Sequence, residues 1–465
     1  MKDAKHNAHP YIPNSVWETK QFMLDEIGVK DVEELYRSIP EELRYRKKMN
    51  LPDPFHSEYE LKQHVESILA KNKDCSTALS FLGGGCYQHH IPAVVDEVVS
   101  RGEFLTAYQG ATYTDKGRFQ VIFEYVSMLT DLLGMEVAGM PTFDSFSASG
   151  TGIRMAGRLT DRDEILVPSN ICPQRLAYIE GYCKDIMNIV MVKADNSTGL
   201  IDLDDLEQKI KDNTGGLFIE NPGYLGAIEY RWDRISSMVH GNGSLLVVSV
   251  NPMSLGLLEA PGNYGADIVT GDGQPLGVHM QCGGGATGFV AVRDDDLFIN
   301  ELPSLLWSIA PLKDGKDGFG FTYAVPTRLS YVAREDSVEF TGTATALWST
   351  ANAVYLALMG PRGMREIGET IIEKSHYAKK VLSEIEGVSI PIQTPHFNEF
   401  IVNFDGTGRT VSQINKALLA HDIFAGKDIS AEFPEYGQSA LYCISEIHSK
   451  ADIDKLAHCL KEVTR

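Results

Sequence analysis

Short apolar runs alternate with longer amphipathic stretches through the middle of this chain. Five of the runs end at turns: EILVP at 164–168, NIVMV at 188–192, GLFIE at 216–220, LLVVSV at 245–250 and ADIV at 266–269. Short aliphatic runs bounded by Gly, Pro or polar residues are typical of buried parallel strands. Because helix-like segments separate them, the pattern predicts an α/β fold in which helices cover both faces of a mostly parallel sheet.

Amphipathic helices are predicted on either side of the sheet region. Residues 118–133 place Phe119, Ile122 and Val126 on one stripe, and Gly134 is positioned to end that helix. A polar, Gly-rich loop, KDGKDGFG, follows the sheet region at 313–320. Toward the C-terminus the pattern predicts a helix at 365–384, strands near 400–403 and 440–445, and a closing helix at 453–463.

The first 75 residues are charged and carry apolar side chains at helical spacing, such as Val32, Leu35 and Tyr36. They hold too little apolar surface for an independent core, which favours an arm that lies over this chain or a neighbour. We therefore predict a helical arm at 1–75, a large α/β domain at 76–342 and a small α+β domain at 343–465.

Composition narrows the function classes. The chain has 465 residues and a net charge of −21, from 42 Lys plus Arg against 63 Asp plus Glu. That charge opposes a phosphate backbone, so we expect no nucleic-acid partner. No apolar run approaches the roughly 20 residues of a membrane span, and the start, MKDAKHNAHPYIP, lacks a signal-peptide core. We therefore expect a cytoplasmic protein with no membrane partner.

Cysteine and histidine patterns indicate neither disulfides nor a metal. The seven cysteines are an odd number without a C-x-x-C pair, which indicates reduced thiols. Cys86 and Cys282 each adjoin a glycine run, and either could line a pocket or pack as a small buried thiol. His89 and His90 are adjacent, so their side chains point in different directions and we expect no metal site.

The segment 244–292 is arranged like the cofactor-binding half of an aminotransferase-type domain that depends on pyridoxal phosphate (PLP). Such enzymes place an Asp after one strand, to pair with the pyridinium nitrogen, and a Lys after the next, to bind PLP covalently. Here Asn251 and Gln274 stand near those points, and no lysine occurs between Lys211 and Lys313. We therefore predict that this chain alone carries no catalytic residue and binds no PLP covalently.

A Ser/Gly-rich segment, FSASGTGIRMAG at 146–157, is predicted to open a helix. In aminotransferase-type folds such a segment holds the cofactor phosphate, which makes Ser149, Gly150 and Thr151 a candidate vestigial cradle. The alternative is an ordinary helix start capped by Ser147, Ser149 or Thr151.

Two further segments are candidates for a substrate pocket. FLGGGCYQHHIPAVV at 81–95 contains Gly83, Gly84, Gly85 and His89, and its glycines permit close approach of the backbone to a ligand or to a packed partner. TAYQGATYTDKG at 106–117 contains Tyr108, Thr112 and Tyr113, whose hydroxyls suit a small carboxylate. The alternatives are a tight structural turn and an exposed polar loop.

Several blocks in order give the chain a family resemblance that runs nearly end to end. They include HPYIPN with IGVKDVEELYRSIPEELR, FLGGGCYQHHIPAVVDEVVSRGEFLTAY, PMSLGLLEAPGNYGADIVTGDGQPLG and HFNEFIVNF. The chain resembles the glycine dehydrogenase (decarboxylating) subunit 1 family, the alpha subunit of the split P-protein of the glycine cleavage system. The resemblance implies an aminotransferase-type fold, PLP fold type I, without the PLP lysine. It also implies a PLP-bearing subunit 2, an active site at the subunit interface of a heterotetramer, and a lipoyl carrier protein that accepts the product.

Three segments, 109–117, 220–229 and 338–349, depart from the family pattern. At the first of them the family usually has TPYQPEISQG, whereas this chain has QGATYTDKG. The leading hypothesis is the PLP-free subunit of a glycine decarboxylase, with Tyr108, Thr112, Tyr113 and the turn 83–85 beside the substrate. A second hypothesis is a subunit of a paralogous two-subunit PLP-dependent decarboxylase or lyase that acts on another amino acid. A third is a non-catalytic binding or regulatory protein on the same fold.

Overall fold

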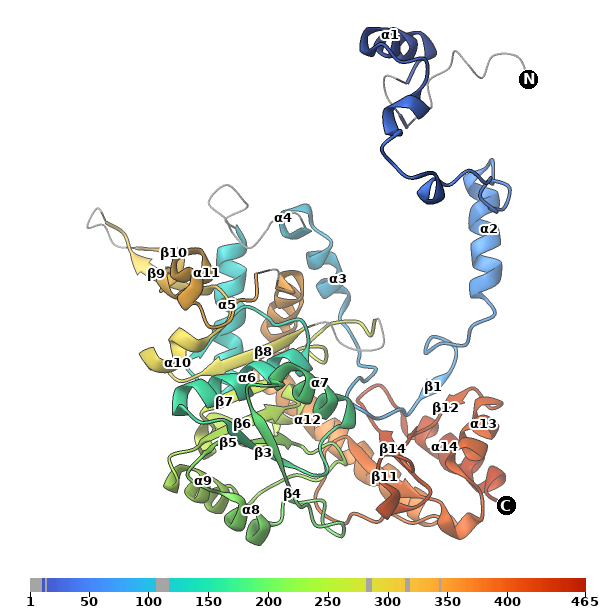
Figure 1. The fold of residues 1–465 in the computed structure, drawn as a ribbon. Helices are drawn as coiled ribbons and strands as arrows, with labels where there is room; N and C mark the ends of the chain where they lie inside the picture. The colour runs from blue at the N-terminus through green and yellow to red at the C-terminus, as the bar shows by residue number, and fades with distance from the viewer. Residues whose placement is uncertain (1–10, 13–14, 106–116, 282–286, 314–317, 343) are drawn as a thin grey trace. The chain divides into compact units, whose positions relative to one another are not determined.

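The computed structural model describes residues 11–12, 15–105, 117–281, 287–313, 318–342 and 344–465 (Figure 1). The chain forms two compact units, Met1–Asn72 and Lys73–Arg465. The first contains α1 (Trp17–Ile27), the 3-10 helices η1 (Val32–Tyr36) and η2 (Glu41–Leu43), and α2 (Glu58–Leu69). Among its described residues only Leu24 is buried, so this unit has no apolar core of its own.

A seven-stranded sheet forms the centre of the second unit, with the strand order β2-β8-β7-β6-β5-β3-β4. Strands β4, β3, β5, β6 and β7 run parallel, whereas β8 is antiparallel to both of its neighbours. The strands are β2 (Val137–Ala138), β3 (Glu164–Pro168), β4 (Asn188–Val192), β5 (Thr214–Asn221), β6 (Leu245–Val250), β7 (Ile268–Asp272) and β8 (Gly288–Val292). The predicted α/β fold with a mostly parallel sheet is confirmed.

Alternate residues of the strands pack on opposite faces of the sheet. In β5, Leu217 and Ile219 join the core cluster that α5 and α9 complete, while Phe218 joins the cluster with α6. This alternation follows from the pleat, which points successive side chains to opposite faces. The covering helices are α5 (Gly117–Leu133), α6 (Ser145–Thr160), α7 (Pro173–Cys183), α8 (Leu203–Lys209), α9 (Trp232–Gly241) and α10 (Asp296–Glu301).

The C-terminal part builds a second, smaller sheet, of order β11-β14-β13. Its strands are β11 (Glu399–Asn403), β13 (Lys427–Asp428) and β14 (Ser439–Cys443), and its helices are α13 (Val411–Leu419) and α14 (Lys450–Val463). The long α12 (Ala346–Ser383) precedes them and is kinked at Gly360, next to Pro361. The boundary at 342 stays a prediction, because the two sheets lie within one compact unit.

An early segment of the second unit pairs with late ones. Strand β1 (Leu79–Ser80) lies parallel to β12 (Ile423–Phe424), and the helices α3 (Ala93–Val99) and α4 (Gly102–Leu105) follow it. The N–H of Gly83 then donates to the carbonyl of Leu441 in β14 at 3.2 Å. Residues 79–83 are thereby attached to the C-terminal sheet.

One structural element contradicts the sequence prediction. Residues assigned to a polar loop at 313–320 belong in part to a hairpin of β9 (Leu306–Pro311) and β10 (Phe319–Ala324). The prediction was wrong at Phe319 and Gly320, because Phe321 packs against Phe123 of α5 and holds the strand there. The remaining short elements are η3 (Pro252–Gly256), η4 (Pro261–Tyr264), η5 (Pro326–Arg328), α11 (Ser330–Ala333), η6 (Arg334–Asp336), η7 (Asp405–Thr407) and η8 (Pro434–Tyr436).

Candidate functional site

A cavity of about 320 Å³ lies at the carboxyl ends of β5, β6 and β7. Glu220, Val250 and Asp272 line it from the ends of these strands, and Gly84 and Glu399 line it from other segments. Open α/β sheets bind ligands outside the carboxyl ends of their strands. This cavity is therefore the candidate functional site.

Arg175 of α7 is the only Lys or Arg among the described residues that line the cavity. Its Nε lies 2.7 Å from Oε1 of Glu220, at the end of β5. Its Nη1 donates to Oγ of Ser149 at 2.5 Å and to Oγ of Ser249 at 3.1 Å. One guanidinium thus joins α7 to α6, β5 and β6, and its charge is already matched by a carboxylate.

The carboxyl groups around the cavity outnumber that cation. Burial raises the pKa of Asp272 to about 6, against the opposing effect of the Gln274 N–H. Burial also raises the pKa of Glu399 to about 7, although bonds from Tyr87 and Gly84 oppose the shift. Burial raises the pKa of Glu220, and the charge of Arg175 opposes it. The cavity therefore has an excess of acidic groups that lack a cationic partner.

The lining residues do not fit covalently bound PLP. Among the described residues around the cavity there is no lysine, and Pro275 occupies the turn after β7. Gln274 is 2% exposed, and its Nε2 donates to two backbone carbonyls. Asn251 lines the cavity after β6, but a neutral amide cannot balance a pyridinium charge. The described lining residues therefore offer neither an amine for the PLP aldehyde nor an acid after β6 for the pyridinium nitrogen.

The candidate cradle at 149–151 lies within α6 and not before it. This helix begins at Ser145, and the carboxylate of Asp144 accepts the N–H of Ser147 at 2.7 Å. The prediction that Ser147, Ser149 or Thr151 caps the helix was wrong, because Asp144 takes the cap position. An anionic cap already complements the positive helix start, which disfavours a phosphate there. A cradle role for 149–151 stays a prediction.

The structure brings the glycine turn to the cavity. Gly84 and Gly85 line it, and both have left-handed backbones with φ of 106° and 96°. A Cβ on Gly83 would lie 2.7 Å from Oε1 of Glu399, so this glycine permits a close approach of the turn to that carboxyl group. Cys86 follows the turn and also lines the cavity.

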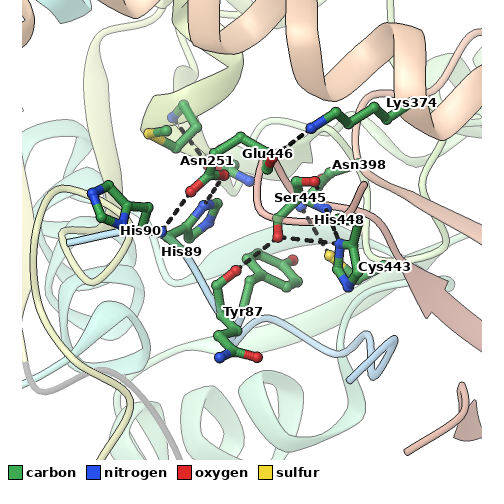
Figure 2. A network of polar contacts seen from close by, with 12 residues as sticks. Tyr87, His89, His90, Asn251, Lys374, Asn398, Cys443, Ser445, Glu446 and His448 are labelled. Atoms are coloured by element: carbon green, nitrogen blue, oxygen red, sulfur yellow. Dashed lines mark hydrogen bonds and ion pairs between the residues drawn. The ribbon is translucent and has the colours of Figure 1, made fainter. Parts of the chain in front are cut away.

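His89 follows the turn along the chain and belongs to a polar network with His90 and Glu446 (Figure 2). Its Nδ1 is 2.7 Å from Oε2 of Glu446, and the N–H of His90 donates to Oε1 of the same carboxylate at 2.6 Å. Burial acts to raise the pKa of Glu446, but the hydrogen bonds from the His89 ring and the N–H of His90 lower it below its usual value. His89 is not among the residues that line the cavity, so its place beside the substrate stays a prediction.

The remaining candidates lie outside the described residues: Tyr108, Thr112, Tyr113 and Cys282. In the described ranges, no group of three or more His, Cys, Asp or Glu is arranged to hold a metal ion. The search for long apolar helices among these residues found none that could cross a membrane.

Sequence reasoning missed the five charged residues of the cavity, which are Asp144, Arg175, Glu220, Asp272 and Glu399. Glu220 and Asp272 lie at the carboxyl ends of strands of the parallel sheet, where ligand-binding groups gather. The sequence pattern therefore contained a signal for these two residues. Arg175 and Glu399 gave no such signal, because their partners are set by tertiary structure.

Comparison with known proteins agrees with this architecture. The sequence profile of the glycine cleavage system P-protein family matches residues 9–460. A "Probable glycine dehydrogenase (decarboxylating) subunit 1" of Staphylothermus marinus is 37% identical, over 99% of this chain and 100% of the relative. A relative of the same name from Pyrococcus abyssi is 36% identical, over 99% of this chain and 100% of its own length.

Solved structures give the same result. The crystal structure of a glycine decarboxylase (P-protein) of the glycine cleavage system, in inhibitor-bound form, matches with a TM-score of 0.84 and 30% identity, over 98% of this chain and 100% of that one. A glutamate decarboxylase of Lactobacillus brevis matches with a TM-score of 0.69 and 13% identity, over 91% of this chain and 95% of that one, and supports the fold alone. The predicted resemblance is confirmed: the chain belongs to the glycine cleavage system P-protein family.

Proposed function

We propose that this chain is the subunit of a two-subunit glycine decarboxylase that binds no PLP itself and completes the active site at its interface with a lysine-bearing subunit 2. The observation that carries the proposal is the absence of lysine from 212 to 312, across the strands that form the cavity. In this fold an amine is needed there to hold PLP. A second chain must therefore supply it.

Two further observations support a partner subunit. Relatives that match this chain over nearly its full length are named subunit 1, which implies a subunit 2. The cavity residues themselves are unsuited to PLP, because Asn251 replaces an acid and Asp144 caps the helix where a phosphate would bind.

In this proposal the residues of this chain shape the pocket and position the substrate. Gly84 and Gly85 form a wall without side chains, which lets a small amino acid or its carrier approach the backbone closely. Tyr108, Thr112 and Tyr113 orient the substrate carboxylate, while Gly83 and His89 support the wall from behind. PLP on the partner supplies the electron sink for CO2 release from glycine. A lipoyl carrier protein then accepts the aminomethyl group.

Co-expression with subunit 2 tests the proposal. The complex should catalyse glycine-dependent CO2 exchange, whereas neither chain alone should. Borohydride reduction in the presence of PLP, followed by peptide mapping, should place the pyridoxyl group on a lysine of the partner. A stoichiometric adduct on one lysine of this chain would contradict the proposal.

Because residues 109–117 differ from the family pattern, the identity of the amino-acid substrate needs its own test. In the assembled complex, QGATYTDKG is replaced by the family's usual TPYQPEISQG, and exchange is measured with glycine and a panel of other amino acids. One unmatched polar contact in a closed pocket costs a factor of about 10 or more. If the unmodified complex prefers another amino acid and the swap raises its exchange rate with glycine, the related decarboxylase is favoured. If the unmodified complex already prefers glycine, the leading proposal is supported.

A further inference from the structure

We propose that Glu399 is a positioning residue that fixes the glycine turn 83–85 against the cavity, a role that rests on the proposed function of that turn as a wall of the active site. Glu399 is the first residue of β11 and is 6% exposed. Its Oε1 accepts the N–H of Gly84 at 2.6 Å, and its Oε2 accepts the hydroxyl of Tyr87. Each carboxyl oxygen thus holds a different residue of one short segment.

The turn also packs tightly against Glu399. A Cβ on Gly83 would meet Oε1 of Glu399 at 2.7 Å and Cγ of Leu441 at 2.8 Å. On the other side, a Cβ on Gly226 would meet the carbonyl oxygen of Glu399 at 2.2 Å. Glu399 therefore lies between two glycine-bearing turns, and its side chain determines where the first of them rests.

Glu399 forms no ion pair with any residue in the described ranges. The groups that face it are Tyr87 and Gly84 on the turn segment, Glu220 at the end of β5, Cys443 of β14, Tyr224 and Lys427. Lys427 is the only cation among them, and its Nζ lies 2.9 Å from Glu432 and 2.6 Å from the hydroxyl of Tyr224. A buried carboxyl group with donors but without an ion-pair partner is costly to keep, which favours a functional reason for its presence.

Cys86 provides a reporter for this anchor. It lies between the two anchored residues, Gly84 and Tyr87, and lines the cavity, and burial raises the pKa of its thiol to about 11. If the carboxyl group is removed, the turn should open and the thiol should become accessible. Cys75, upstream of β1, is also partly exposed and serves as the reference within the same sample.

The experiment measures N-ethylmaleimide labelling of Cys86 relative to Cys75 in the full chain by peptide mass spectrometry. Glu399→Ala should raise the ratio several-fold. Glu399→Gln should stay near the native ratio, because its oxygen still accepts from Gly84 and its amide donates to the Tyr87 oxygen. Tyr87→Phe removes one of the two bonds and should give a smaller rise. Glu229→Gln, a change in a buried glutamate that does not line the cavity, should leave the ratio unchanged.

The outcomes separate the two proposals. An unchanged Cys86 ratio in a folded Glu399→Ala chain would overturn the anchor, as would equal labelling of the Ala and Gln variants. If Glu399→Ala fails to fold, which labelling of the buried Cys183 of α7 reports, then Tyr87→Phe decides the matter. In the co-expressed complex, Glu399→Ala should raise KM for glycine more than it lowers kcat. Absence of exchange by the native complex would contradict the proposed function, while the labelling would still decide the role of Glu399.

Discussion

The two sides of the cavity hold buried carboxyl groups in different ways. On the strand side, Glu220 forms an ion pair with Arg175 at 2.7 Å. On the side of the small sheet, Glu399 is bound by the hydroxyl of Tyr87 and the N–H of Gly84, and none of the ion pairs in the described part of the chain includes it. One carboxylate therefore belongs to the scaffold, whereas the other is a titrating anchor with a pKa near 7.

Removing the charge of Arg175 should change the free energy of unfolding more than any other substitution on the two sides of the cavity. Arg175→Met leaves Glu220 buried without its partner, and breaking a buried pair in this way costs about 3–5 kcal/mol. Chemical unfolding measures the change. The control is Arg365→Met, whose pair with Glu369 is 72% and 55% exposed and should cost about 0–1 kcal/mol. Equal losses in the two variants would mean that Arg175 carries no buried-pair energy.

The pH dependence of the free energy of unfolding should reveal the raised pKa of Glu399, on the side of the small sheet. The pKa of Glu399 is raised from 4.5 to about 7 in the folded chain, so the folded state holds the proton more tightly than the unfolded state. Its contribution is greatest below about pH 4.5 and is lost as the pH rises through 7. Relative to the native chain, Glu399→Gln should gain stability over that interval, by about 3 kcal/mol at most.

Urea unfolding at several pH values between 4.5 and 8.5 checks this expectation. Asp272, whose pKa is raised to about 6, titrates in both proteins and cancels in the difference. A difference that does not change with pH would show that Glu399 stays charged throughout.

The glycine turn itself should give the smallest of the three effects. Gly84 has φ of 106°, so Gly84→Ala is expected to cost about 1–3 kcal/mol in backbone strain. The nearest neighbour of a Cβ there would be the flexible Lys427 side chain, at 3.1 Å, and the Tyr224 hydroxyl would lie at 3.8 Å. Gly181→Ala in α7, where a Cβ has open space, should instead stabilise by about 0.5–1 kcal/mol. Thermal unfolding of both variants compares them, and stabilisation by Gly84→Ala would contradict the strain argument.

Much of the sheet could be predicted from local pattern. The runs at 164–168, 188–192 and 245–250 become β3, β4 and β6 with the predicted bounds, and 118–133 becomes α5 with one further residue at its start. These segments are decided by aliphatic runs and helical stripes, which need no knowledge of the partner strand. Local physics also predicted Gly134 as the helix end, where φ is 65°.

The charged part of the site could not be predicted in the same way. Glu399 lies 315 positions from Gly84 along the chain, and its role appears only when β11 and the glycine turn meet. Arg175 resembles a solvent-facing residue of an amphipathic helix until the register of β5 places Glu220 opposite it. The cap of α6 was missed because Ser and Thr suggested nearer candidates than Asp144. Long-range pairing and competing cap residues therefore limit what the pattern reveals.

The attachment of residues 79–83 to the C-terminal sheet has a consequence for how the protein is made. The carbonyl of Ser80 accepts from His448, 368 positions later, and β1 pairs with β12. At a synthesis rate of about 5–20 residues per second, the early segment leaves the ribosome roughly 20–70 s before its partners exist. During that interval its strand edge is open to other nascent chains, and loops of such length close slowly. Chaperone supply during translation should therefore affect the yield of this chain.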